Sequence, residues 1–185
     1  MDRLTSIIVP MEDVESHDPW VVVDSLSVFA AKMGERGFAT DDLPDPVLWN
    51  SQVTNAFGQI SRNGPSLYFY NVLAGHDGTP RWHRIVSATR QGLQALGDIP
   101  QIAAFDHLLS LYEENRAAIL QGRRDNRPFK LPNDFDLLCR FMPFREAEDE
   151  FMERRVRWVR SLDTIRSVPR EDYEQELAKL AGPAG

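Results

Sequence analysis

The sequence predicts an all-α fold, a single compact domain of six to eight helices joined by short loops. The 185 residues suffice to bury a core. Proline and glycine mark helix starts and stops along the chain, and apolar residues recur between them at helical spacing. Strand patterns are almost absent, because only residues 6–10 (SIIVP) are typical of an extended segment, and one strand makes no sheet.

The first two long helices are each predicted from an Asp-Pro pair, in which aspartate caps the helix and proline occupies its first turn. The pairs are Asp18-Pro19 and Asp45-Pro46. Gly34 and Gly37 end the first helix, and Asn63-Gly64 ends the second. The apolar stripes are Val23, Leu26, Phe29, Ala30 and Met33 in the first helix, and Trp49, Val53, Phe57 and Ile60 in the second.

The stretch RNGPSLYFYN predicts a tight corner followed by a short helix. Gly64 is free to adopt a positive φ at the helix end, and Pro65 begins the next helix. Residues 66–74 are apolar nearly all round, which is typical of a buried helix. The alternative is a ligand pocket lined by Tyr68 and Tyr70.

The remaining helices follow the same punctuation. One is predicted from Thr79-Pro80 to Gly97 and one from Pro100 to Gly122. A polar connector at 123–134 precedes a short helix at 134–142, a long amphipathic helix at 144–165 and a final helix from Pro169. We assign residues 1–17 to an acidic N-terminal extension and residues 18–182 to the domain.

The formal net charge of −7 is unevenly distributed along the chain. Residues 1–60 hold ten acidic and three basic residues, whereas residues 61–132 hold six and nine. This asymmetry argues against direct nucleic-acid binding, which normally shows a basic stripe, and permits a partner that is itself basic. We predict contacts to that partner through Glu12, Asp13, Glu15, Asp18, Asp41, Asp42 and Asp45.

The alternative for these acids is a structural role. Acidic residues at helix starts are stabilised by the helix dipole, which accounts for Asp18 and Asp45 without any partner. Residues 171–176 hold a further acidic group, open to the same alternative. The acidic run at 146–150 is expected to lie on a solvated helix face whose acids pair with arginines four residues on, such as Glu150 with Arg154 and, beyond the run, Glu153 with Arg157.

The sequence carries no catalytic signature. The four histidines form no metal-binding motif, and Cys139 is the only cysteine, so no disulfide or cysteine-built zinc site is expected. His76 and Asp77, in the turn GHDG, are the candidates for a small metal-dependent hydrolase, but turn chemistry also explains them. We predict no enzyme activity, no cofactor, no membrane segment and a cytoplasmic protein.

A helix ending in NAFGQISRNG is followed by the aromatic run LYFYN, a helix with LQALG and a helix starting IPQIAAF. In this order these elements resemble a bacterial domain family named for the C-terminal domain of a DNA-mimic protein. The resemblance covers residues 41–165, although Pro65 stands where the family has a second glycine. It implies a helical fold, architectural rather than catalytic motif residues and, more loosely, binding to a DNA-binding protein through carboxylates that replace phosphates. The matching positions are Asn63, Gly64, Phe69, Tyr70, Asn71, Leu96 and Gly97.

The sequence therefore indicates a non-enzymatic protein that binds another protein. The leading hypothesis is an acidic DNA mimic or inhibitor of a basic, nucleic-acid-binding protein. The alternative is an immunity protein that neutralises a toxin, since small acidic chains also suit that role. The sequence leaves open whether the protein forms a homodimer.

Overall fold

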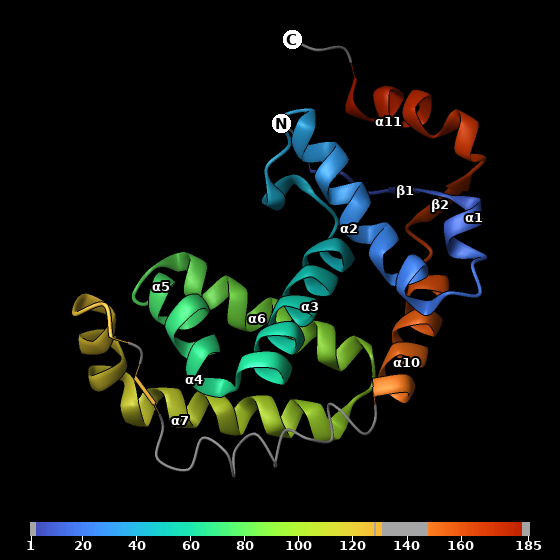
Figure 1. Cartoon of the computed structure of the whole chain (residues 1–185). Coiled ribbons are helices and arrows are strands. Elements are labelled where there is room, and N and C mark those ends of the chain that lie inside the picture. The colour runs from blue at the N-terminus through green and yellow to red at the C-terminus, as the bar shows by residue number, and fades with distance from the viewer. Residues whose placement is uncertain (1–2, 128, 131–147, 183–185) are drawn as a thin grey trace. The chain divides into compact units, whose positions relative to one another are not determined.

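The computed structural model describes residues 3–127, 129–130 and 148–182 and is mainly helical in these residues (Figure 1), which confirms the predicted all-α class. The chain divides into two compact units. Unit 1 is Met1–Ser51 with Asp149–Gly185, and unit 2 is Gln52–Glu148. Residues 18–182, which the sequence groups into one domain, are thus shared between the two units, and the boundary falls within α3 (Asp45–Asn63).

Unit 1 is built from both ends of the chain around a small sheet. The strand β1 (Ile7–Pro10) pairs in parallel with β2 (Ile165–Val168), with Ile7 opposite Ile165 and Pro10 opposite Val168. The helical elements are α1 (Met11–Val14), α2 (Pro19–Glu35), the 3-10 turn η1 (Thr40–Asp42), the start of α3, α10 (Glu148–Arg160), the 3-10 turn η3 (Arg170–Asp172) and α11 (Tyr173–Ala181).

The sheet corrects two predictions. Residues 6–10 do pair with another strand, and the helix expected over 144–165 ends at Arg160, so Ile165 begins a strand instead. The cause is a pairing between segments about 158 positions apart, which a local pattern does not reveal. The first part of that helix and the short helix expected at 134–142 lie outside the described residues.

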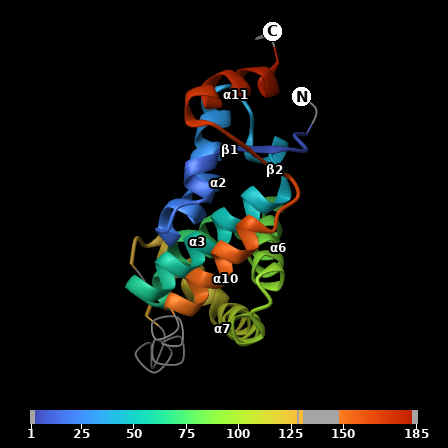
Figure 2. The ribbon, with the colours of Figure 1, turned by 90° about the vertical axis from the view of Figure 1, so that its right-hand side faces the viewer.

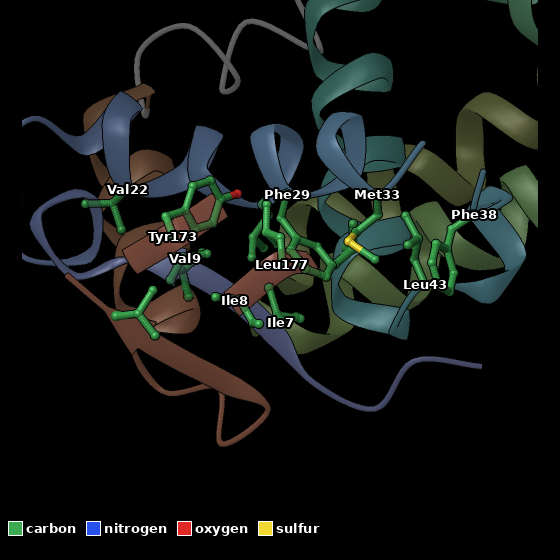
Figure 3. Close-up of a cluster of buried hydrophobic side chains, with 14 residues drawn as sticks. Ile7, Ile8, Val9, Val22, Phe29, Met33, Phe38, Leu43, Tyr173 and Leu177 are labelled. Carbon is green, nitrogen blue, oxygen red and sulfur yellow. The ribbon is translucent and has the colours of Figure 1, made fainter. Parts of the chain in front are cut away.

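The core of unit 1 surrounds β1. Ile7, Ile8 and Val9 are fully buried, and β1 contacts both α2 and α11. Figure 3 shows Tyr173 and Leu177 of α11 beside this strand, in one cluster with side chains of α2. Burial of one such aliphatic side chain contributes about 1.5–3 kcal/mol. Residues 1–17, predicted to be an acidic extension, therefore contain β1, the strand around which this core packs.

The regular elements described in unit 2 are all helical, joined by short turns. The predicted proline starts are confirmed for α6 (Pro80–Ala95) and α7 (Ile99–Arg124), and these two helices pack against each other (Figures 1 and 2). Asp98 caps α7, since its carboxylate accepts a hydrogen bond from the Gln101 backbone N–H at 3.2 Å. The elements after α3 are α4 (Pro65–Tyr68), the π-helical turn η2 (Phe69–Leu73), α5 (Ala74–His76), α6 (Pro80–Ala95) and α7 (Ile99–Arg124).

The predicted corner at Gly64 is confirmed. Gly64 has φ 80° and ψ 167°, a conformation that only glycine adopts without strain. The short helix behind it is buried as predicted, since Tyr68 is 1% and Phe69 0% exposed. The Phe69 ring meets the Tyr112 ring edge-on, with 5.5 Å between centroids. The aromatic run is therefore part of a hydrophobic core.

The end of α7 differs from the prediction by two residues. The helix runs past Gly122 to Arg124, and the chain then folds back so that the Arg127 N–H donates to the Gly122 carbonyl at 2.7 Å. A Cβ at Gly122 would lie 2.6 Å from the Arg127 carbonyl oxygen. Gly122 is thus needed for close approach inside the helix rather than as its terminator.

Candidate functional site

The acids of α1 take part in internal contacts of unit 1. The Glu12 carboxylate accepts a hydrogen bond from the Arg170 backbone N–H at 3.3 Å, and Asp13 forms an ion pair with the Arg170 guanidinium at 2.5 Å. Backbone N–H groups, its own and that of Arg170, lower the pKa of Glu12. These two predicted partner-binding residues therefore join α1 to the turn that follows β2.

Glu15 and Asp18 both lie just before the start of α2, but their side chains have different surroundings. Asp18 is the N-cap, and its carboxylate accepts the Trp20 backbone N–H at 2.9 Å, which is the structural alternative proposed for it. Glu15 is exposed, and no ion pair engages it among the described residues. Of the acids near the start of α2, Glu15 is thus available to a partner.

The second acidic group lies after the end of α2. Asp45 pairs with Arg3, and the Asp42 carboxylate accepts the Ala39 backbone N–H at 2.8 Å. Asp41 is exposed on η1. Most of this group thus fastens the N-terminal segment and the 3-10 turn in place.

The seven predicted acids do not form one patch. One group lies on α1 and at the start of α2, and the other follows the end of α2 (Figure 1). The 17 residues of α2 span about 25 Å at the rise of an α-helix. A partner that contacts both groups has to extend along the whole of this helix.

Two of the acids near the C-terminus, Glu174 and Glu176, are also engaged within unit 1. Glu174 accepts from Lys32 at 3.0 Å and from Arg36 at 2.6 Å, and these side-chain bonds lower its pKa. Glu176 is held between Lys179 and Arg166, with the same effect on its pKa. Glu174 therefore joins α11 to the C-terminal part of α2, and Glu176 joins α11 to β2.

The pairs predicted on α10 are confirmed, at 3.7 Å for Glu150 with Arg154 and 3.5 Å for Glu153 with Arg157. Arg155 of the same helix is buried and donates to the Asn50 side chain at 2.8 Å. Burial lowers the pKa of Arg155 to about 10, and the charge of Asp24 on α2 opposes this shift.

One face of α2 carries exposed apolar side chains that the sequence analysis did not single out. Trp20 is 51% exposed, Val28 37% and Val21 36%. The exposed Asp24 lies between them in the sequence. The stripe predicted to face the core is correct, since Val23, Leu26, Phe29 and Met33 are buried. The signal for the exposed face was already present, because Trp20, Val21 and Val28 fall outside that stripe.

The motif residues of the family resemblance lie in unit 2. Asn71 is exposed and donates to Gln59 at 3.4 Å, and the Tyr70 carbonyl accepts from Arg123 at 2.5 Å. Leu96 is buried, and Gly97 has φ 67° at the end of α6. The side chain of Asn63 lies outside the described residues. Where they are described, these residues form turns and packing contacts, which fits an architectural role.

The turn with His76 and Asp77 holds its carboxylate in an internal contact. The Arg116 side chain donates to both oxygens of Asp77, at 3.0 and 3.1 Å, and Asp77 is only 12% exposed. Burial and the charges of Arg81 and Arg123 lower the pKa of His76. Within the described ranges, no group of three histidine, cysteine or acidic side chains is placed to hold a metal ion.

The chain matches no family model, no curated protein and no solved structure. The resemblance to the DNA-mimic domain family therefore stays a hypothesis that rests on the motif residues alone. Among the described helices, none combines the length and the apolar character needed to cross a membrane.

Proposed function

We propose that the chain is a non-enzymatic, cytoplasmic binding protein whose acidic unit 1 recognises a basic, nucleic-acid-binding protein. The observation that carries this proposal is the charge of unit 1, which holds 18 acidic and 10 basic residues, against 10 and 11 in unit 2. Opposite charge speeds association and selects partners even where it adds little affinity.

The carboxylates of unit 1 that form internal ion pairs limit how closely the unit can imitate DNA. Duplex DNA presents one charge per about 1.7 Å, whereas many acids of unit 1 have cationic partners inside the unit. Imitation of a long row of phosphates thus has less support than recognition of a short basic segment. DNA mimicry remains the form that the family resemblance favours, and inhibition of the bound protein would follow from it.

A toxin-neutralising immunity protein is the second candidate, because Trp20 is half exposed beside two exposed valines. Tryptophan is enriched among the residues that dominate protein interfaces. An immunity protein of this type would rely on apolar contacts, so its binding would tolerate salt.

The test captures partners on the immobilised full chain from an extract of cells that produce it. We expect a basic nucleic-acid-binding protein that is released by high salt and by excess duplex DNA. The double variant Glu15→Lys and Glu171→Lys, at two exposed acids of unit 1, should reduce capture about tenfold. The matched control is Glu113→Lys with Glu114→Lys, an identical charge change in unit 2.

Circular dichroism should show that both double variants fold. Capture that resists salt and DNA, with the two variants equivalent, would contradict the acidic proposal. If Trp20→Ala alone then abolished capture, the immunity hypothesis would replace it.

A further inference from the structure

The exposed face of α2 combines apolar and acidic side chains in a helical register. Trp20, Asp24 and Val28 are spaced by four residues, and Val21 lies three residues before Asp24, so all four lie on neighbouring positions of one helix face. In the described residues, four of the five large exposed apolar side chains belong to unit 1, and three of them are on this face. We call Trp20, Val21, Asp24 and Val28 the α2 face.

Two exposed carboxylates, those of Asp24 and Glu15, lie on or next to the α2 face. One cation lies close to the second of them, since the Arg160 side chain donates to the Val14 and Ser16 carbonyls at 2.9 Å. Asp24 lies between the apolar residues and is exposed; its charge acts on the buried Arg155, but no ion pair holds its carboxylate within the described ranges. Glu15, also exposed, precedes the start of the helix. A carboxylate set between exposed apolar side chains is matched by a cation set between apolar side chains on the partner.

We infer that the α2 face docks a basic amphipathic helix of the partner protein. This inference rests on the proposed function and adds the surface and the chemistry of the segment that it takes. Leucine-like side chains of the partner helix cover Trp20, Val21 and Val28, and a lysine or arginine between them meets Asp24. The eight-residue separation of Trp20 and Val28 corresponds to about 12 Å, which matches anchors at i, i+4 and i+7 of a partner helix.

A second copy of the chain fits the α2 face poorly. In a symmetric dimer through this face, each subunit would present the same acidic patch to the other, so like charges would oppose across the interface. A nucleic acid is disfavoured for the same reason. The α2 face is small, so a transient complex is expected.

The test uses synthetic helical peptides of about 14 residues with the full-length chain. The first peptide has leucines on one face and lysines on the other, and the second has the same composition in scrambled order. Binding is followed by fluorescence anisotropy of the labelled peptide. We expect the amphipathic peptide to bind at least about tenfold more tightly than the scrambled one.

The variants locate the binding surface. Trp20→Ala should weaken binding of the amphipathic peptide about tenfold, and Asp24→Asn should weaken it roughly threefold to tenfold and reduce its salt dependence. Ile99→Ala removes a 76% exposed apolar side chain from unit 2, and Glu114→Gln removes one exposed charge there, so neither should change binding. Circular dichroism checks that each variant folds.

The outcomes separate this inference from the proposed function. Equal binding of both peptides, unaffected by Trp20→Ala, would overturn the inference and leave the charge-based function standing. If neither peptide binds, the inference falls, and the capture test decides the proposed function separately. A wild-type dimer that Trp20→Ala dissociates, measured by analytical ultracentrifugation, would also overturn the inference, because the α2 face would then be a self-association surface.

Discussion

Unit 1 and unit 2 use their charged residues differently. In unit 2, arginines bond to nearby acids and carbonyls of the same unit, as Arg116 does to Asp77 and Arg123 to the Tyr70 carbonyl. Unit 1 also pairs many of its acids, but it leaves Glu15 and Asp24 exposed close to apolar side chains. Net charge alone therefore does not locate a binding surface. What matters is which charges have no internal partner and what surrounds them.

The two units also differ in how far along the chain their core contacts reach. The core of unit 1 joins residues 7–10 to residues 165–177, whereas the described core of unit 2 is built within residues 52–124. The entropic cost of closing the loop between these two segments is therefore higher for unit 1, and its stability depends more on the burial of β1.

The largest effect is expected from removal of the apolar side chains of β1. Replacement of Ile7, Ile8 and Val9 by alanine should cost at least about 6 kcal/mol, since each fully buried aliphatic truncation costs about 2–5 kcal/mol or somewhat less for valine. That is comparable to the whole stability of a domain, so unit 1 should unfold. Hydrogen exchange should show lost protection in β2 and α11 and retained protection in α7. Equal loss in both units would show that they unfold as one.

The second effect is the counterpart in unit 2. Phe69→Ala should lower the free energy of unfolding by about 3–5 kcal/mol, because the ring is fully buried against Tyr112. Exchange in α7 should accelerate while β1 keeps its protection. If Phe69→Ala instead left stability unchanged and abolished partner binding, the aromatic run would be a ligand site rather than core.

Helix starts could be predicted from the sequence because their signals are local. A polar residue followed by proline correctly marked the starts of α2, α3 and α6, although of Asp18 and Thr79 only Asp18 accepts a capping hydrogen bond, and Asp45 is the first residue of α3. The glycine corner at Gly64 followed from backbone sterics alone. The strand β2 and the division into two units could not be predicted, since both depend on contacts between residues far apart in the chain.

The candidate site was predictable only in part, for the same reason. The sequence locates the acids, but whether a carboxylate is available depends on remote partners such as Arg170 for Asp13 and Arg3 for Asp45. The confirmed pairs on α10 are four residues apart and were therefore predictable. Exposure of Trp20, in contrast, could have been predicted, because Trp20 falls outside the apolar stripe that packs against β1.

The third effect tests the corner that begins α4. Gly64→Ala should destabilise the protein by about 1–3 kcal/mol, because φ 80° with ψ 167° is strained for any residue with a Cβ. The matched control is Gly58→Ala, in the interior of α3, where a Cβ meets no atom within 4 Å. That change should stabilise the protein by roughly 0.5–1 kcal/mol through helix propensity. Urea denaturation measures both, and equal signs would refute the assigned role of Gly64.

The smallest effect concerns an acid that is engaged within unit 1. Lys32 and Arg36 lower the pKa of Glu174 below its ordinary value of 4.5, so its ionised form favours the folded state. This contribution is fully present above about pH 4.5 and is lost as the pH falls through the lowered pKa. Glu174→Gln should therefore lower Tm slightly at pH 7, and the difference from wild type should shrink at an acidic pH below 4.5, where Glu174 becomes protonated.

Glu171→Gln is the matched control, because Glu171 is exposed in η3 and no ion pair holds it among the described residues. It should leave Tm unchanged at both pH values. Added salt should shrink the effect of Glu174→Gln at pH 7, since exposed ion pairs are screened. A Glu174→Gln effect that does not shrink as the pH is lowered would mean that packing of the side chain, not its charge, joins α11 to α2. The internal ion pairs of unit 1 would then be weaker than their distances indicate, and more of its acidic side chains would be available to a basic partner.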